Sequence, residues 1–212
     1  MVHATEASSD VVGGIFQVAD MNFSSERYIK FVGIKGERTD DRRVTIDAVG
    51  LRRAIQSGEI GGGGADTVFK GKIVGIEPNA AHVETPADLL TYVGALSAND
   101  ENIEGIEMLT SQVVIRYFND GKLFGFIPIR FASTNTIDAS ASASERVKVR
   151  FPWFSVLIWG PPSQQELEND LNAGLNFDIQ NSASAYARAM QMVINVLKTK
   201  HDTVKNSISN VR

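Results

Sequence analysis

The sequence predicts an α+β protein rich in β-strands. We expect an antiparallel sandwich or small barrel, of which a jelly roll is one form, with short helices in the connections and a helical C-terminal extension. Alternating apolar and polar segments separated by turn residues predict about six or seven strands. The last fifty residues contain no proline and one glycine, Gly174, which favours helix there. No internal repeat is visible, which argues against solenoids and propellers.

Three regions follow from this pattern. Residues 1–24, rich in serine, threonine and acidic residues, predict a mobile N-terminal arm. Residues 25–162 predict a β-rich body, and residues 163–212 the helical extension. At 212 residues, the chain is long enough to bury one sizeable core.

The first half of the body mixes strands and helices. Residues 28–35 predict a strand. Residues 44–58 predict a short strand that leads into a helix, with Asp47 as N-cap and Gly58 as its end. Five of the seven residues in 58–64 are glycine, which predicts a flexible loop.

A strand and a helix follow this loop. Residues 67–77 return to a strand pattern. Residues 84–96 predict a helix, because Thr85 is a good N-cap and Pro86 suits the first helical position.

The clearest local pattern is an antiparallel hairpin in residues 112–131. Two apolar, β-branched and aromatic runs flank Asn119-Asp120-Gly121, and Asp-Gly supplies the positive φ values that tight turns need. Pro128 cannot donate to a ladder, so the returning strand should lie at an edge or a bulge there. The low-complexity residues 138–145 predict a surface loop.

A strand rich in aromatic residues follows that loop. Residues 146–151 alternate between basic and apolar side chains, the period of a half-buried strand. After Pro152 the chain is apolar on both faces, which indicates a segment covered on both sides, by this chain's own helices or by a neighbouring subunit. Core packing and a subunit interface therefore remain alternatives for Phe151, Trp153, Phe154 and Trp159.

Two helices are predicted in the C-terminal extension. Ser163 and Glu166 have the spacing of a capping box, and Gly174 ends the first helix. A second, amphipathic helix covers about residues 183–209 and should reach about 40 Å, beyond the width of a small domain. Part of it should then project or lie along another chain. Its apolar positions are Tyr186, Met190, Val193, Leu197, Val204 and Ile208.

No motif predicts a catalytic, cofactor or metal site. The chain has no cysteine, and His3, His82 and His201 lie far apart without a zinc-ligand spacing. There is no nucleophile elbow around any serine, and the glycine-rich loop lacks the Lys-Ser or Lys-Thr of a P-loop. Without a secretory signal or an apolar run long enough to span a bilayer, we expect a cytoplasmic protein or one incorporated in a virion.

The leading hypothesis is a non-enzymatic structural protein that self-assembles into a shell or tube, as a viral coat or capsid subunit does. The predicted interface consists of the four aromatic residues of 151–159 and the six apolar positions of the long helix. A third hypothesis is an enzyme whose carboxylates, distant in sequence, converge in the fold.

The second hypothesis is a module that binds nucleic acid or an anionic ligand, although the net charge of −4 gives no overall reason to expect such a module. Its contacts would be Lys35, Arg38, Arg42, Arg43, Arg52 and Arg53, which four acidic residues interrupt.

Overall fold

The computed structural model describes residues 32–35, 43–60, 70, 73–74, 77–109, 111–175, 179 and 182–210. The predicted arm over residues 1–24 and the glycine run after Ile60 lie outside these residues. So does most of the strand predicted over residues 67–77. Within that segment Lys70 and Ile73 have helical backbone, which contradicts a strand at those two positions.

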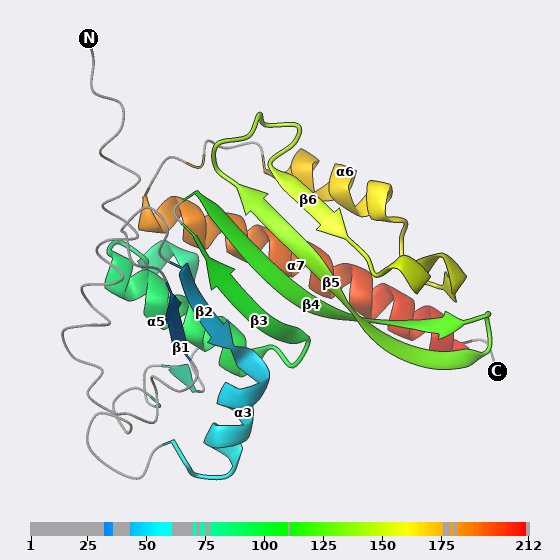
Figure 1. The fold of residues 1–212 in the computed structure, drawn as a ribbon, viewed down its shortest axis with the longest axis horizontal. Coiled ribbons are helices and arrows are strands. Elements are labelled where there is room, and N and C mark those ends of the chain that lie inside the picture. The colour runs from blue at the N-terminus through cyan, green and yellow to red at the C-terminus, as the bar shows by residue number, and fades with distance from the viewer. Residues whose placement is uncertain are drawn as a thin grey trace.

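The body is one antiparallel sheet whose strands follow the order β1-β2-β3-β4-β5-β6 (Figure 1). These strands are β1 (Val32–Lys35), β2 (Arg43–Asp47), β3 (Ile103–Met108), β4 (Gln112–Leu123), β5 (Ile127–Asp138) and β6 (Val147–Arg150). A seventh, β7 (Ile158–Trp159), pairs with the far end of β4. The antiparallel α+β prediction is confirmed. The sandwich or barrel is not: the sheet is open, and no second sheet faces it among the described residues.

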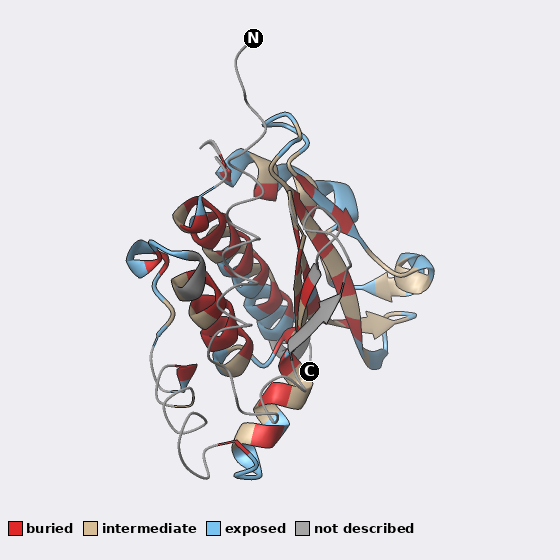
Figure 2. Ribbon diagram, turned by 60° about the vertical axis from the view of Figure 1, so that its left-hand side comes forward, coloured by how far each residue is buried: buried red, intermediate tan, exposed pale blue. Residues whose placement is uncertain are grey.

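Helices take the place of the second sheet. α5 (Pro86–Asn99) and α7 (Ala183–Asn210) lie on one face of the sheet, with their buried sides turned towards it (Figures 1 and 2). The shorter α3 (Ala48–Gln56) follows β2, and the one-turn η1 (Ala80–His82) precedes α5. Since these helices bury one face of the sheet, no second sheet is needed to form a core.

The helix starts are where the sequence predicts them. Asp47 Oδ1 accepts a hydrogen bond from Gly50 N at 2.9 Å and caps α3. Thr85 and Asp88 form a reciprocal capping box at the start of α5. Ser163 Oγ accepts from Glu166 N at 3.2 Å and caps α6 (Gln164–Gly174). Each cap satisfies an N–H group that the helix leaves unpaired.

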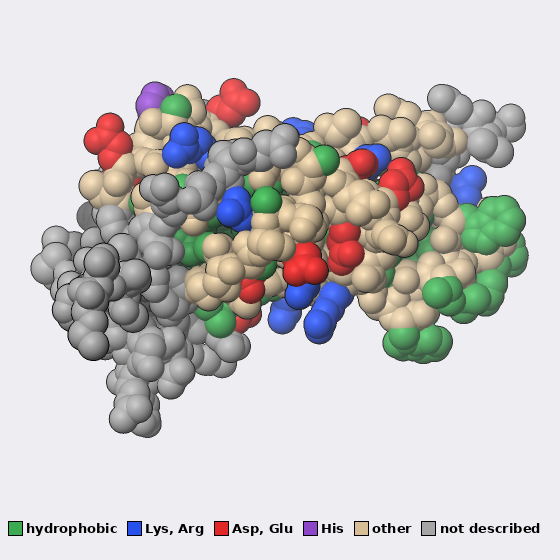
Figure 3. All heavy atoms as spheres, turned by 90° about the horizontal axis from the view of Figure 1, so that it is seen from above, with side chains coloured by type: hydrophobic (Ala, Val, Ile, Leu, Met, Phe, Trp, Pro, Cys, Tyr) green, Lys and Arg blue, Asp and Glu red, His purple; other side chains and the backbone are tan. Residues whose placement is uncertain are grey.

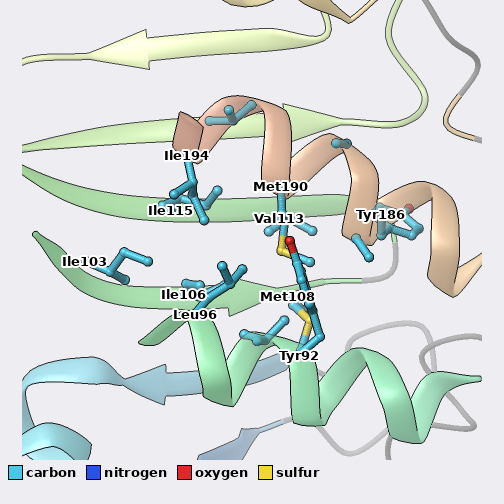
Figure 4. Packing of buried hydrophobic residues seen from close by; sticks show 14 of the residues in the cluster. Tyr92, Leu96, Ile103, Ile106, Met108, Val113, Ile115, Tyr186, Met190 and Ile194 are labelled. Atoms are coloured by element: carbon cyan, nitrogen blue, oxygen red, sulfur yellow. The ribbon is translucent and has the colours of Figure 1, made fainter. Parts of the chain in front are cut away.

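The core lies between the sheet and the two long helices (Figure 4). α5 contributes Tyr92 and Leu96, and α7 contributes Met190 and Ile194. The strands contribute alternate residues such as Ile106, Met108, Val113 and Ile115. α7 therefore belongs to the same core as the sheet, and most of its length is used inside the subunit.

The hairpin of β4 and β5 is confirmed, but its predicted turn is wrong. Asn119, Asp120 and Gly121 lie within β4, where Asp120 pairs with Arg130. The chain reverses four residues after Asp120-Gly121, at Phe124 and Gly125, which both have positive φ. Pro128 lies where β5 has no described partner on its outer side, because β6 pairs only with Thr134–Ile137, so the edge prediction is confirmed.

α6 covers the outer edge of β6 with its side chains. Asn172 both accepts from Val147 N at 2.8 Å and donates to Val147 O at 2.9 Å. Glu168 Oε1 accepts from Val149 N at 2.7 Å. An open strand edge invites pairing with another chain, and these side chains occupy the groups that would pair.

Candidate functional site: an exposed apolar tip

Large apolar side chains gather in the open at one end of the molecule (Figure 3). We call this surface the tip. It is formed by the β4–β5 turn and by the segment that contains η2 (Trp153–Leu157) and β7. Its members are Phe124, Phe126, Ile127, Trp153, Val156, Leu157 and Trp159. Trp153 is 85% exposed and Val156 is 83% exposed, values that are unusual for such residues.

The two segments of the tip are held together by backbone pairing. β7 pairs with β4 through Lys122–Trp159 and Leu123–Ile158, on the edge of β4 that β3 leaves free beyond Tyr117. Phe124 N donates to Leu157 O at 2.9 Å. Gly121 permits this approach, because a Cβ at that position would collide with the side chain of Ile158.

The tip is also anchored to the sheet below it. The Phe151 ring meets the Phe131 ring edge to face at 5.6 Å between centroids. Phe124 has a φ of 54°, a left-handed conformation that is costly for a bulky residue. The local structure thus holds an exposed phenylalanine in a strained conformation rather than folding it inwards.

The apolar surface of the tip is larger than a solitary protein normally exposes. With aromatic side chains of about 150–250 Å² each, the exposed parts of its seven residues sum to roughly 800 Å². The largest apolar patch on a typical monomer is about 300–600 Å². Lys122 is the single charged residue in residues 121–128, and residues 151–165 contain none. The tip therefore fits an apolar partner.

The structure divides the predicted interface residues into two groups. Trp153 and Trp159 lie on the tip, while Phe151 and Phe154 are half-buried beneath it. The helix residues are placed elsewhere: Tyr186, Met190, Val193, Leu197 and Val204 are buried against the chain's own sheet and helices. Their side chains are not available to a neighbouring subunit. The side chain of Ile208 lies outside the described residues.

The predicted polyanion contacts do not form a described surface. Arg38 and Arg42 lie outside the described residues, as do the side chains of Lys35 and Arg43. Arg53 is exposed on α3. Arg52 is committed to the fold, because its guanidinium donates to the carbonyl oxygens of Ser97, Asp100, Glu101 and Ile103 at 2.6–3.3 Å. The prediction that Arg52 contacts a polyanion is therefore wrong, because its guanidinium is engaged within the fold.

On the face of the sheet that no described helix covers, which we call the open face, lie charged residues that no local sequence pattern predicts. Cross-strand pairing aligns Arg116, Thr134 and Arg150 in one row and Val114, Thr136 and Lys148 in the next. Towards β2 and β3 the same face carries Asp47, Glu104 and Glu107, which line a pocket of about 180 Å³ with Arg116. These residues are distant in the sequence, and the strand register is needed to show that they lie on one face.

No catalytic arrangement stands out among the described residues. His82 is exposed, and His201 is buried with Nε2 3.5 Å from Asp120 Oδ2. Within the described part of the chain, no three histidine or acidic side chains are placed to hold a metal ion. None of the described helices combines the length and apolar character needed to cross a bilayer.

Comparison with protein-family models, with curated proteins and with solved structures finds no match to this chain. Any function must therefore be argued from the geometry.

Proposed function

We propose that this protein is a non-enzymatic structural subunit that self-assembles, and that the tip is a contact between copies. Assemblies of this kind include the coats and capsids of viruses. The observation that carries the proposal is the exposed apolar surface of the tip, with Trp153 and Trp159 in it.

The area of the tip supports a second copy as its partner. A standard protein interface buries about 800 Å² on each side, which is about the apolar area that the tip exposes. Among the described residues, Val74 is the one large exposed apolar side chain outside the tip. The matching apolar surface is therefore the tip of another copy. The alternative of edge pairing through β6 is disfavoured, because α6 occupies that edge.

The experiment uses the two tryptophans of the chain, which both lie on the tip. The mass in solution is measured by sedimentation velocity over a concentration series, together with tryptophan emission. We expect the mass to rise with concentration and the emission to move to shorter wavelength as the tips become buried.

The variant Phe126→Ser/Val156→Ser removes apolar surface from the tip but keeps both tryptophans. We expect it to weaken this contact by about tenfold or more, since each large apolar side chain contributes about 1.5–3 kcal/mol when fully buried. Val74→Ser is the control, because it removes an exposed valine outside the tip. A wild-type protein that is monomeric throughout, or a tip variant that assembles unchanged, overturns the proposal. So does an emission shift that appears only with anionic phospholipid vesicles, which identifies a lipid surface as the partner.

A further inference from the structure

Charges of opposite sign lie on different strands of the open face, and the two sets meet where Arg116 lines the pocket with Asp47, Glu104 and Glu107. The acidic half of this face carries Asp47, Glu104 and Glu107 on β2 and β3. The basic half carries Arg116 on β4 and Lys148 and Arg150 on β6. The three basic side chains are exposed, and Asp138 on β5, which shares this face, interacts electrostatically with Lys148.

The pairing register confirms that these side chains share one face. Thr45, Glu107 and Val114 are cross-strand neighbours, as are Asp47, Gly105 and Arg116. The residues between them, Ile46, Ile106 and Ile115, are buried on the helix side. Since adjacent strands lie about 4.8 Å apart, three strand spacings, or about 14 Å, separate β3 from β6.

We propose that the open face is a second contact between copies of this chain, in which the acidic half of one copy lies against the basic half of the other. A two-fold axis that runs parallel to the strands, between the two halves, produces this arrangement on both sides at once. Two sheets that face each other lie about 10 Å apart, a distance that arginine and glutamate side chains span together.

A nucleic acid fits this face less well than a second copy. Its phosphates would match the basic half, but the acidic half would repel the continuing chain. The separation of charge complements a partner with the same separation, and a second copy has it. The same rotation that pairs the halves keeps like charges apart.

This inference rests on the proposed function and extends it. A contact of tip against tip closes after two copies, so it cannot by itself build a shell or tube. A second contact on a different surface continues the assembly. The tip and the open face are formed by different residues, which allows each contact to be removed separately.

The test is Arg116→Glu/Arg150→Glu, measured by sedimentation velocity with tryptophan emission as before. Assembly should stop at a dimer held by the tips, with the emission still shifted, because the open faces now repel. Arg53→Glu/Lys198→Glu is the matched control: it makes the same change in net charge at two exposed helix positions and should assemble as wild type does. Thermal unfolding of both variants checks that they are folded.

A charge swap distinguishes a contact between open faces from a general effect of charge. Adding Glu104→Arg/Glu107→Arg to the first variant exchanges the two halves, and the two-fold arrangement is again complementary. We expect this fourfold variant to regain assembly beyond the dimer. The tip variant Phe126→Ser/Val156→Ser should retain a dimer that dissociates in about 1 M salt, where surface charges are screened.

The two proposals fail in different ways. If Arg116→Glu/Arg150→Glu assembles as the wild type does, the contact between open faces is overturned and the tip contact stands. If the charge swap restores nothing while the fold is intact, the two-fold pairing is overturned. If the double arginine variant instead loses binding to a single-stranded oligonucleotide that the wild type binds, the partner of this face is a nucleic acid. A tip variant that assembles unchanged overturns the proposed function itself.

Discussion

At the scale of single residues, Arg52 shows how a cationic side chain is used inside the fold. Its guanidinium joins α3 to the end of α5 and to the start of β3 through four carbonyl oxygens. Burial lowers the pKa of Arg52 below its ordinary value, and the nearby Asp100 opposes that shift. We predict that Arg52→Gln lowers the free energy of unfolding by about 2 kcal/mol, because the carbonyl groups, most of them partly buried, lose a charged donor. Chemical denaturation measures this. Arg53→Gln, an exposed change on the same helix, should stay within about 0.5 kcal/mol, and equal effects of the two changes would contradict the assignment.

Because three tyrosines are buried, we predict a loss of stability at high pH. Burial raises the pKa of Tyr186 to about 12, and it raises the pKa of Tyr92 and Tyr117 further. The folded-state pKa of each tyrosine lies above the unfolded value of about 10. The stability gained by keeping these phenols protonated in the fold is therefore complete below pH 10 and is lost as the pH rises towards 12. We expect phenolate absorbance from these side chains to appear together with the loss of far-ultraviolet circular dichroism. Tyr186→Phe should move the midpoint of unfolding to higher pH. Phenolate absorbance of all four tyrosines near pH 10 in a folded protein would contradict the burial.

At the scale of elements, α6 protects the edge of β6. Asn172→Ala removes the side chain that pairs with both backbone groups of Val147, and its loss leaves a half-buried N–H and C=O unpaired. We predict a loss of about 1–3 kcal/mol in the free energy of unfolding. Asn195→Ala, at an exposed position of α7, is the control. Equal stability of the two variants would show that solvent replaces these bonds. Greater aggregation of Asn172→Ala is also expected, because the strand edge opens.

Elements with a strong local cause were predictable, and those that depend on tertiary context were not. The caps at Asp47, Thr85 and Ser163 and the helical spacing of α7 are decided by nearby residues. The turn was misplaced because Asp-Gly fits a tight turn, but the strand continues through it to pair with Arg130. In the same way, the aromatic residues after Pro152 have the composition of a core. Their exposure depends on the pairing of β7 with β4.

The candidate site was predictable in part for the same reason. The residue type alone predicts that Trp153 and Trp159 are core or interface residues. The sequence predicts Phe124, Phe126 and Ile127 as part of the hairpin, and no local pattern indicates that they lie near the tryptophans. The charged residues of the open face come from four strands, so their separation by sign appears once the register is known.

At the scale of the whole molecule, the helical extension and the sheet share one core and should unfold together. Leu197 on α7 is buried in that core, so Leu197→Ala should lower the free energy of unfolding by about 2–5 kcal/mol. Because the core is shared, native-state hydrogen exchange should accelerate in β3 and β4 as much as in α7. Lys198→Ala, a change at the exposed neighbouring residue, should leave the free energy of unfolding and the hydrogen exchange unchanged. For the same reason, a chain that ends at Gly174 should lack a folded sheet, since it loses the helix that covers β4. If exchange accelerates in α7 alone, or the shortened chain keeps a folded sheet, then residues 163–212 are a separable extension and α7 becomes available again as a contact between subunits.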